Sequence, residues 1–319
     1  MDLNQILETL RVAQLPMRSK FRGITTREVA LFEGPAGWGE FSPFLEYDDI
    51  ESANWLKSAV EAATVNNFPS YRSSIKINGT IPATDSAEEI EKLIASYPGA
   101  EVFKVKVGTN QESDLARLKL VKKFAPAAKL RIDVNGSWSV DEALQNIESI
   151  YSEIGELEYV EQPVSNLESL KKLKERLKVD VKIAGDEVIR KAIDPFAMNL
   201  DGAVDILMLK VAPLAGIKRS LAIAEHHNLP VVVSSALESA VGMSHGLRLA
   251  AALPKLDYAC GLATGSLFTS DLATHEIRDG AISLTSQTPN LEALARFAAP
   301  PERLEWWRDR IKRCWEVLG

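Results

Sequence analysis

Charged side chains recur through the middle of the chain at intervals of about one strand plus one helix. The intervals are 27, 28, 25 and 24 residues, and the side chains that they separate are Lys106, Asp133, Glu161, Asp186 and Lys210. Each charge stands at or near the end of a short apolar run, as in "FKVKVG", "RIDVNG", "YVEQP" and "IAGDE". Buried charges are unfavourable unless they are paired or bound to a metal. The pattern therefore predicts that the five side chains share one site.

The three carboxylates of that set predict a site for a hard divalent cation. Three anions brought together repel one another, and a metal ion between them removes the repulsion. All-oxygen ligands suit Mg²⁺, and Mn²⁺ is the second possibility. Taken singly, Asp133, Glu161 or Asp186 could instead cap a helix or pair with a surface lysine. The regular spacing and the flanking lysines favour the metal site.

The stretch "FKVKVG" places Lys104 and Lys106 on one face of a strand, because strand side chains alternate. On a surface strand such a face would be solvated or would protect a sheet edge. In a parallel barrel it would point inward. A lysine that acts as a base needs a lowered pKa, which neighbouring cations and partial desolvation provide. Lys104, Lys210 and the metal would be such neighbours of Lys106.

These parts suit the removal of a proton α to a carboxylate. The product enolate carries a second negative charge, so the proton is only weakly acidic. A metal bound to the carboxylate oxygens stabilises the developing charge, and a lysine takes the proton. A small anionic carboxylate is therefore the expected substrate.

The elements that must position these residues alternate between strand and helix. From about residue 75 to 270, β-branched runs alternate with charged amphipathic segments, which is typical of a parallel sheet. Three helices are expected to begin with a Ser-x-x-Glu capping box, at Ser86/Glu89, Ser139/Glu142 and Ser165/Glu168. Eight strands fit a closed barrel or an open doubly wound sheet. Polar residues at many strand ends, and the lack of a glycine-rich nucleotide-binding motif, favour an α/β barrel of the TIM type.

The sequence divides into three regions. Residues 1–84 mix short alternating runs with one helical pattern and predict an α+β domain. Residues 85–285 predict the barrel, whose first strand could begin near residue 74. Residues 286–319 end in the amphipathic segment "PERLEWWRDRIKRCWEVL", which we expect to pack back on the N-terminal region.

Five motifs, "KVKVG", "RIDVNGSW", "VEQP", "AGDE" and "LMLKVAPLAG", resemble the enolase superfamily in their order and spacing, and within it the muconate-lactonizing subgroup. The resemblance extends to the "GWGEFSPF" loop and so covers nearly the whole chain. It implies a modified TIM barrel, (β/α)7β, with an α+β capping domain formed by the N-terminal region and the C-terminal tail.

The resemblance also implies roles for the charged residues. Lys106 would be the base, and Lys210 would lie on the opposite face of the substrate. The implied Mg²⁺ ligands are the three carboxylates, Asp133, Glu161 and Asp186. Three further residues would support this set from behind, namely Lys104, Asn135 and Glu187.

Two motifs near the last strands, "SSALESAVG" and "CGLATG", resemble the branch of this subgroup that serves menaquinone biosynthesis. That branch dehydrates 2-succinyl-6-hydroxy-2,4-cyclohexadiene-1-carboxylate, which is a lyase reaction. The residues that would hold the succinyl carboxylate are Ser234, Ser235 and Gly261. A basic loop over residues 16–23, with Arg18 and Arg22, resembles the mobile cap loop of the family.

Other reactions share the same metal-binding triad. N-succinylamino acid racemases and dipeptide epimerases use the two lysines as paired acid and base, and muconate cycloisomerases are a further alternative. No Asp-x-Asp follows the last strand, and "GLATGSLF" lacks the acidic residue expected in muconate cycloisomerases. A barrel that binds a ligand without catalysis is the alternative from a different class. Loss of one triad member would have indicated it, and all are present.

Composition narrows the class of protein further. The 319 residues carry a net charge of −7, which argues against a general nucleic-acid binder. The two cysteines, Cys260 and Cys314, have no metal-type spacing and do not suggest a disulfide framework. The first residues, "MDLNQILETL", do not resemble a signal peptide, and no apolar run reaches about 20 residues. We therefore expect a soluble cytoplasmic protein that does not contact membranes, and its oligomeric state stays open.

Overall fold

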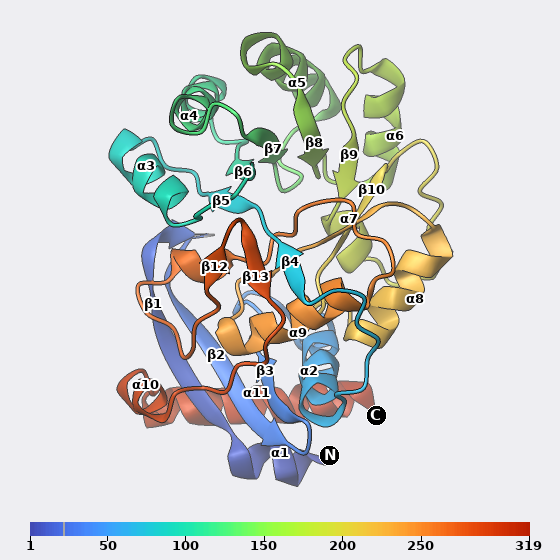
Figure 1. Cartoon of the computed structure of the whole chain (residues 1–319). Coiled ribbons are helices and arrows are strands. Elements are labelled where there is room, and N and C mark those ends of the chain that lie inside the picture. The colour runs from blue at the N-terminus through green and yellow to red at the C-terminus, as the bar shows by residue number, and fades with distance from the viewer. Residues whose placement is uncertain (22) are drawn as a thin grey trace.

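The computed structural model describes residues 1–21 and 23–319, so Arg22, one of the expected substrate contacts, lies outside the described residues. The N-terminal region forms a capping domain, drawn in blue in Figure 1. Its three strands are antiparallel and lie in the order β1 (Arg11–Phe21), β2 (Ile24–Gly34) and β3 (Gly37–Phe41). Two helices belong to the same region, α1 (Leu3–Thr9) and α2 (Asp49–Thr64).

The C-terminal tail completes the capping domain. After the short α10 (Leu291–Arg296), the long α11 (Pro301–Leu318) packs along α2 and β1, at the bottom of Figure 1. Trp307 of α11 is fully buried, its ring meets Phe41 edge-on at 5.6 Å, and its indole N–H donates to Glu28 Oε2 at 2.7 Å. The predicted return of the tail to the N-terminal region is therefore confirmed.

A curved parallel sheet forms the second part of the molecule. Its seven strands are, in spatial order, β11 (Val231–Val233), β10 (Ile206–Leu209), β9 (Ile183–Gly185), β8 (Leu157–Glu161), β7 (Lys129–Asp133), β6 (Val102–Lys106) and β5 (Gly79–Ile81). The helices that follow these strands are α3 (Ala87–Ala95), α4 (Gln111–Phe124), α5 (Val140–Ile154), α6 (Leu167–Arg176), α7 (Glu187–Arg190), α8 (Ile217–His227) and α9 (Ala240–Ala252). Strand order follows chain order, as a (β/α) barrel requires.

The ring closes through two isolated bridges around residues 260–261. Gly261 pairs with Ser234 just beyond β11, and Cys260 pairs with Ile77 just before β5, both in parallel. The amide of Gly261 donates to Val233 O at 2.9 Å, and the amide of Asn78 donates to Cys260 O at 2.9 Å. The segment "DYACGL", at residues 257–262, thus supplies the eighth position of the ring through these bridges rather than through a full strand. The predicted fold class is confirmed.

A small second sheet stands beside the barrel. It holds β12 (Ile277–Arg278), β13 (Ala281–Ser283) and β4 (Ser74–Lys76), paired antiparallel in that order. Residues 74–76 therefore pair outside the barrel, whose first strand is β5. Two short 3-10 helices, η1 (Pro195–Ala197) and η2 (Thr264–Leu267), lie in the connections before β10 and after the bridge segment.

The three predicted capping boxes differ in how well they agree with the structure. Ser139 and Glu142 form the full capping box of α5. Ser86 accepts the Glu89 amide at 3.2 Å, but the Glu89 carboxylate bonds the Thr84 hydroxyl instead of reaching back. The box expected at Ser165 is wrong: Asn166 caps α6 and accepts the amide of the residue three positions on, because its side-chain oxygen is an equally good acceptor one residue later.

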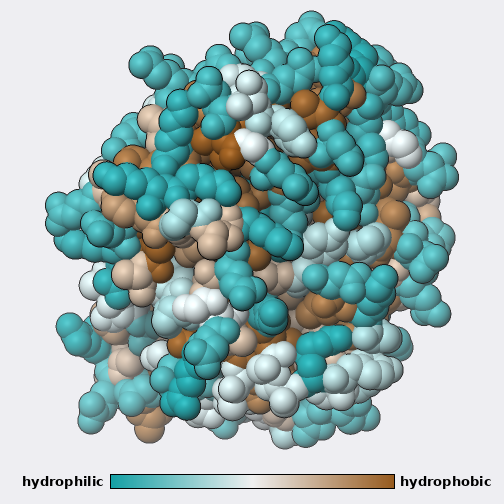
Figure 2. Space-filling view, turned by 45° about the horizontal axis from the view of Figure 1, so that its top comes forward, coloured by the Kyte–Doolittle hydropathy of each residue, from teal (hydrophilic) through white to brown (hydrophobic). Residues whose placement is uncertain are grey.

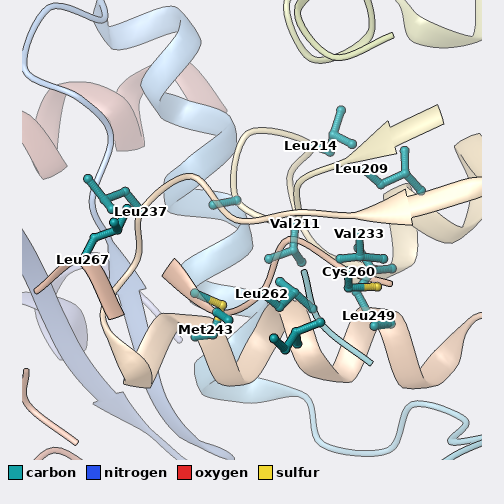
Figure 3. Packing of buried hydrophobic residues seen from close by; sticks show 14 of the residues in the cluster. Leu209, Val211, Leu214, Val233, Leu237, Met243, Leu249, Cys260, Leu262 and Leu267 are labelled. Carbon is teal, nitrogen blue, oxygen red and sulfur yellow. The ribbon is translucent and has the colours of Figure 1, made fainter. Parts of the chain in front are cut away.

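Apolar residues fill the space between the barrel strands and their helices. Figure 3 shows Leu209 and Val233 of the last strands above Leu249 of α9, with Cys260 between. Hydrophilic residues predominate on the face drawn in Figure 2. Among the described residues, none of the helices has the length and apolar character needed to cross a membrane.

Candidate active site

The parallel register of the barrel sets charged residues of neighbouring strands at one level. Lys106 on β6 pairs in register with Asp133 on β7, and Asp133 pairs with Glu161 on β8. All three end their strands, so they stand at the carboxyl-terminal mouth, where barrels of this type carry their sites. Because side chains alternate, Lys104 points to the same face as Lys106 from one level deeper.

Lys106 is held between two oxygen acceptors. Its Nζ donates to Asp133 Oδ2 at 2.6 Å and to Asn135 Oδ1 at 2.7 Å. Asn135 has a left-handed backbone (φ 51°), a conformation that asparagine tolerates better than most residues. Its Nδ2 in turn donates to Glu187 Oε1 at 3.2 Å. This chain of contacts orients the ammonium group at the mouth of the barrel.

Lys104 lies beneath the mouth and is only 5% exposed. Its Nζ is 2.7 Å from Glu161 Oε2 and 3.1 Å from Asp133 Oδ2. Burial lowers the pKa of Lys104, but the charges of Glu161 and Asp133 outweigh burial and raise the pKa well above its usual value. Lys104 therefore stays a cation and neutralises part of the acidic charge above it.

Lys210 approaches from the other side of the mouth. It follows β10, and its Nζ lies 2.5 Å from Asp186 Oδ2. The second oxygen, Asp186 Oδ1, lies 3.3 Å from Arg190 Nε, one helical turn further along α7. Burial raises the pKa of Asp186, but Lys210 and Arg190 lower it overall. Lys210 and Lys106 line the same cavity.

The two carboxylates nearest Lys104 have pKa values that are shifted in opposite directions. Burial raises the pKa of Asp133, but the lysines around it, Lys106 first, hold that pKa well below its usual value. The pKa of Glu161 instead rises to about 7, because burial and the charge of Asp133 outweigh the attraction of Lys104. Glu161 is thus held less firmly in its charged form than Asp133.

Two carboxylate oxygens at the mouth fit an additional cation. Glu161 Oε1 and Asp186 Oδ1 are buried and accept no hydrogen bond. A buried carboxylate oxygen that accepts no hydrogen bond is unfavourable, and a metal ion would satisfy it. Asp186 Oδ1 is compensated in part by its ion pair with Arg190. Across residues 1–21 and 23–319, no three Asp, Glu, His or Cys side chains stand close enough to ligate a metal as they are. Each carboxylate of the site directs an oxygen to a lysine, so ligation by Asp133, Glu161 and Asp186 stays a prediction.

The three residues expected to hold the succinyl carboxylate lie together, just beyond β11 and in the segment that pairs with it. Ser234 and Ser235 line the cavity, and Ser235 Oγ is 2.7 Å from Thr264 Oγ1. Gly261 is not among the described residues that line it. It stands directly behind Ser234 instead, where an added Cβ would lie 2.5 Å from Ser234 Oγ.

Arg18 lies apart from this cavity. Its Nε donates to Ser266 O at 3.1 Å, and it borders a neighbouring hollow formed with residues 262–282. The reason is that Met17 pairs with Phe268, which holds this end of β1 against the segment after η2. The structure therefore does not bring Arg18 to the hollow that the two lysines share.

The capping domain adds residues that sequence reasoning missed. Three of its aromatic side chains line the cavity: Phe44, Tyr47 and Trp55. Arg190 was missed as well, although it stands four residues after Asp186 and hence on the same face of the helix. Its guanidinium lies 3.0 Å from Glu187 Oε1, and 3.4 Å from both Tyr47 Oη and Glu51 Oε1. It connects the cap to the acidic mouth.

The sequence matches two domain families over most of its length. Residues 85–289 match the family described as enolase C-terminal domain-like, and residues 12–63 match the one described as enolase N-terminal domain-like. The o-succinylbenzoate synthases of Mycobacterium ulcerans and Mycolicibacterium smegmatis are each 48% identical to it over 320 residues. These alignments cover 99% of this chain, with 96% and 98% of the respective relatives.

Solved structures share the same fold. The muconate lactonizing enzyme of Pseudomonas putida superposes with a TM-score of 0.73 at 22% identity, over 91% of this chain and 98% of that one. The L-Ala-D/L-Glu epimerase of Bacillus subtilis superposes with a TM-score of 0.72 at 22% identity, over 88% and 96%. Fold, site geometry and family matches agree, and the chain belongs to the enolase superfamily, with the fold of its muconate-lactonizing members.

Proposed function

We propose that the chain is an o-succinylbenzoate synthase. It would dehydrate 2-succinyl-6-hydroxy-2,4-cyclohexadiene-1-carboxylate to o-succinylbenzoate, a lyase reaction of menaquinone biosynthesis. The observation that carries the proposal is the pair Lys106 and Lys210. They line one cavity and lie at the ends of β6 and β10, which are separated in the sheet by the three strands that the carboxylates end or follow. The relatives that bear this name at 47–48% identity support the choice of substrate.

In this proposal Lys106 is the base. Its neutral amine removes the proton α to the ring carboxylate, and the C–H electron pair moves into the enolate. The resulting ammonium then gives that proton to the departing hydroxyl on the same face, so the C–O bond breaks, water leaves and the ring becomes aromatic. Asp133 and Asn135 fix the Nζ of Lys106 in place for both transfers, and such positioning is a large part of general base catalysis.

Lys210 remains a cation in this proposal and transfers no proton. Its contact with Asp186 aims the ammonium into the hollow, where it would stabilise the negative charge of the enolate. Asp133, Glu161 and Asp186 would hold Mg²⁺ or Mn²⁺, which when bound supplies charge stabilisation for the substrate carboxylate. Glu161 Oε1 and Asp186 Oδ1, which are buried and accept no hydrogen bond, support this assignment.

Substrate contacts would come from both sides of the hollow. Ser234 and Ser235, backed by Gly261, would bind the succinyl carboxylate. Arg22 would act from the cap loop, whereas Arg18 binds Ser266 O beside the neighbouring hollow and would contact the substrate only if this loop moved. The substrate is a small anionic carboxylate, and we place the reaction in the cytoplasm.

A second candidate keeps the site and changes the reaction. Two lysines that approach one hollow from different strands could act as an acid and a base on opposite faces, as an N-succinylamino acid racemase requires. Dipeptide epimerase and muconate cycloisomerase activities are weaker alternatives, because the acidic residues expected for them are missing from the sequence.

One experiment separates these reactions. The protein is mixed with Mg²⁺ and the cyclohexadiene substrate, and aromatisation is followed by ultraviolet absorbance. The synthase proposal expects turnover that stops when EDTA removes the metal. If the diene is not turned over but N-succinyl amino acids exchange their α proton with deuterium, the racemase takes its place. If neither reaction occurs and no Mg²⁺ binds, the barrel is a non-catalytic binder.

A further inference from the structure

Arg27 on β2 is a buried cation that no step of the proposed reaction uses. It is 2% exposed although it lies in the capping domain, outside the ring of charged residues at the barrel mouth. A buried guanidinium persists only where its donors find acceptors. The acceptors of Arg27 belong to two different parts of the molecule.

On the barrel side, Arg27 binds the turn that follows β11. Its Nε donates to Leu237 O at 3.1 Å, and its Nη2 lies 3.4 Å from Ala236 O. Ala236 and Leu237 both line the cavity that holds the two lysines. Figure 3 shows Leu237 at the cap end of this turn.

On the cap side, Arg27 binds the segment that follows β3. Its Nη2 also donates to Ser42 O, and its guanidinium carbon lies 4.2 Å from the centre of the Phe44 ring, in a cation–π arrangement. Phe44 lines the same cavity. One side chain therefore touches both the cap wall and the barrel wall of the hollow.

The barrel wall needs an external support of this kind. Leu237 has φ +68°, a left-handed conformation that is unfavourable for a residue with a bulky side chain. The cap supports the next residues too, because Glu40 of β3 accepts the amides of Ser239 at 3.1 Å and Gly242 at 3.0 Å at the start of α9. The cap thus holds the strained turn at residues 236–237 and again at the start of α9.

We propose that Arg27 is the positioning residue that sets the separation of the cap wall and the barrel wall, and thereby the fit of the succinyl part of the substrate. This inference rests on the proposed function, because Phe44 and residues 234–237 line the part of the cavity that we assign to the succinyl group, whereas Lys106 and the carboxylates act on the ring. Arg27 touches none of the reacting groups, and it acts through Phe44, Ala236 and Leu237.

This role requires an arginine rather than any cation. The planar guanidinium offers several donors at fixed angles, so it can bind Leu237 O, Ala236 O and Ser42 O at once and still stack on Phe44. A lysine carries the same charge as a single point with three rotatable donors and cannot hold both walls together. Loss of the bridge should weaken binding of substrate and transition state alike, and it should therefore raise KM more than it lowers kcat.

The test compares Arg27→Lys and Arg27→Met with a matched arginine on the same domain. Arg303 of α11 is the control, because its guanidinium donates to both carboxylate oxygens of Glu28 on β2 and packs on Trp306. Among the described residues, no contact joins it to the cavity walls. Arg27→Lys should raise KM for the diene by about tenfold and lower kcat by less than about threefold, since a charged hydrogen bond contributes about that much. Arg303→Lys should lower Tm without changing KM.

Hydrogen–deuterium exchange gives a readout that does not depend on which substrate is correct. In Arg27→Lys, peptides that cover residues 234–242 should exchange faster than in the wild type, and in Arg303→Lys they should not. If the wild type acts only on N-succinyl amino acids, KM is compared for those substrates instead, with α-proton exchange as the assay. Failure of the proposed function can then be distinguished from failure of this inference. If Arg27→Met does not fold, the KM and the exchange rates of Arg27→Lys alone test the proposal. Unchanged KM and unchanged exchange in Arg27→Lys, or a fall in kcat with KM intact, would overturn the proposal.

Discussion

Lys106 and Asp133 end neighbouring strands at the same register, and Lys106 Nζ lies 2.6 Å from Asp133 Oδ2. The contact joins the proposed base to a proposed metal ligand, so removal of the proton and stabilisation of the enolate would take place at adjacent positions. Lys104 supports the same pair from below, 3.1 Å from Asp133 Oδ2. The mouth therefore works as one electrostatic unit, in which a change to one charge alters its neighbours.

Replacing Lys106 by alanine should abolish dehydration, because no other described amine contacts both Asp133 and Asn135. We expect a loss in kcat of at least about a hundredfold, as for removal of a general base. Mg²⁺ binding, measured by calorimetry, should persist. Lys129→Ala, at an exposed position of β7, is the control and should leave turnover intact. Retained turnover in Lys106→Ala would show that the base is misassigned.

Replacing Asp186 by asparagine should weaken the proposed metal site. The change removes one negative charge and leaves Lys210 and Arg190 facing a neutral amide. Mg²⁺ affinity should fall by about tenfold or more, since even residues that support metal ligands matter to that extent. Asp141→Asn, which alters an exposed ion pair with Arg176, is the control. An unchanged Mg²⁺ affinity in calorimetry would count against Asp186 as a ligand.

Gly261→Ala should raise KM for the diene. The new Cβ would lie 2.5 Å from Ser234 Oγ, so the serine must rotate or shift in the cavity wall. Loss of one hydrogen bond to a charged carboxylate predicts a rise of about tenfold. Gly265→Ala is the matched control, because its Cβ would meet nothing nearer than an Asp271 oxygen at 3.9 Å. Equal KM values for the two variants would refute a role for Ser234 in binding.

Glu238 should make stability depend on pH. This carboxyl lies beside the strained turn, and burial together with the charge of Glu40 raises its pKa from 4.5 to about 7. Between these two values the folded chain binds more protons than the unfolded chain, so the free energy of unfolding falls as pH rises. The full effect is about 3 kcal/mol, and it is complete above the folded-state pKa.

Glu238→Gln removes that contribution. From pH 5 to pH 8 the wild type should lose about 3 kcal/mol of unfolding free energy more than the variant does, measured by denaturant titration. Glu225→Gln, on the exposed side of α8, is the matched control. Parallel profiles for the wild type and Glu238→Gln would contradict the assignment.

The charged residues at the strand ends could be predicted from the sequence, because they recur at a regular spacing. One charged residue recurs in each βα unit, so the regular interval between these residues indicates the site. The alternation of strand side chains puts Lys104 on the same face as Lys106. The placement of Asp133, Glu161 and Asp186 at one mouth follows from the same rule. Local signals also located the start of α5 correctly at Ser139.

The walls of the hollow could not be predicted in the same way. Arg27 contacts Leu237, 210 positions away, and no spacing rule connects a cap strand to a barrel turn. The position of Arg18 depends on the bridge between Met17 and Phe268, which are even further apart in sequence. Such contacts are decided by how the cap docks on the barrel, and only the folded structure shows them.

The most direct test of the central claim is a crystal structure of the protein with Mg²⁺ and o-succinylbenzoate. The metal should lie about 2.1 Å from one oxygen each of Asp133, Glu161 and Asp186, with the product carboxylate bound to it. The aromatic ring should stand between Lys106 and Lys210. A metal bound elsewhere, or a product that does not reach both lysines, would contradict the account.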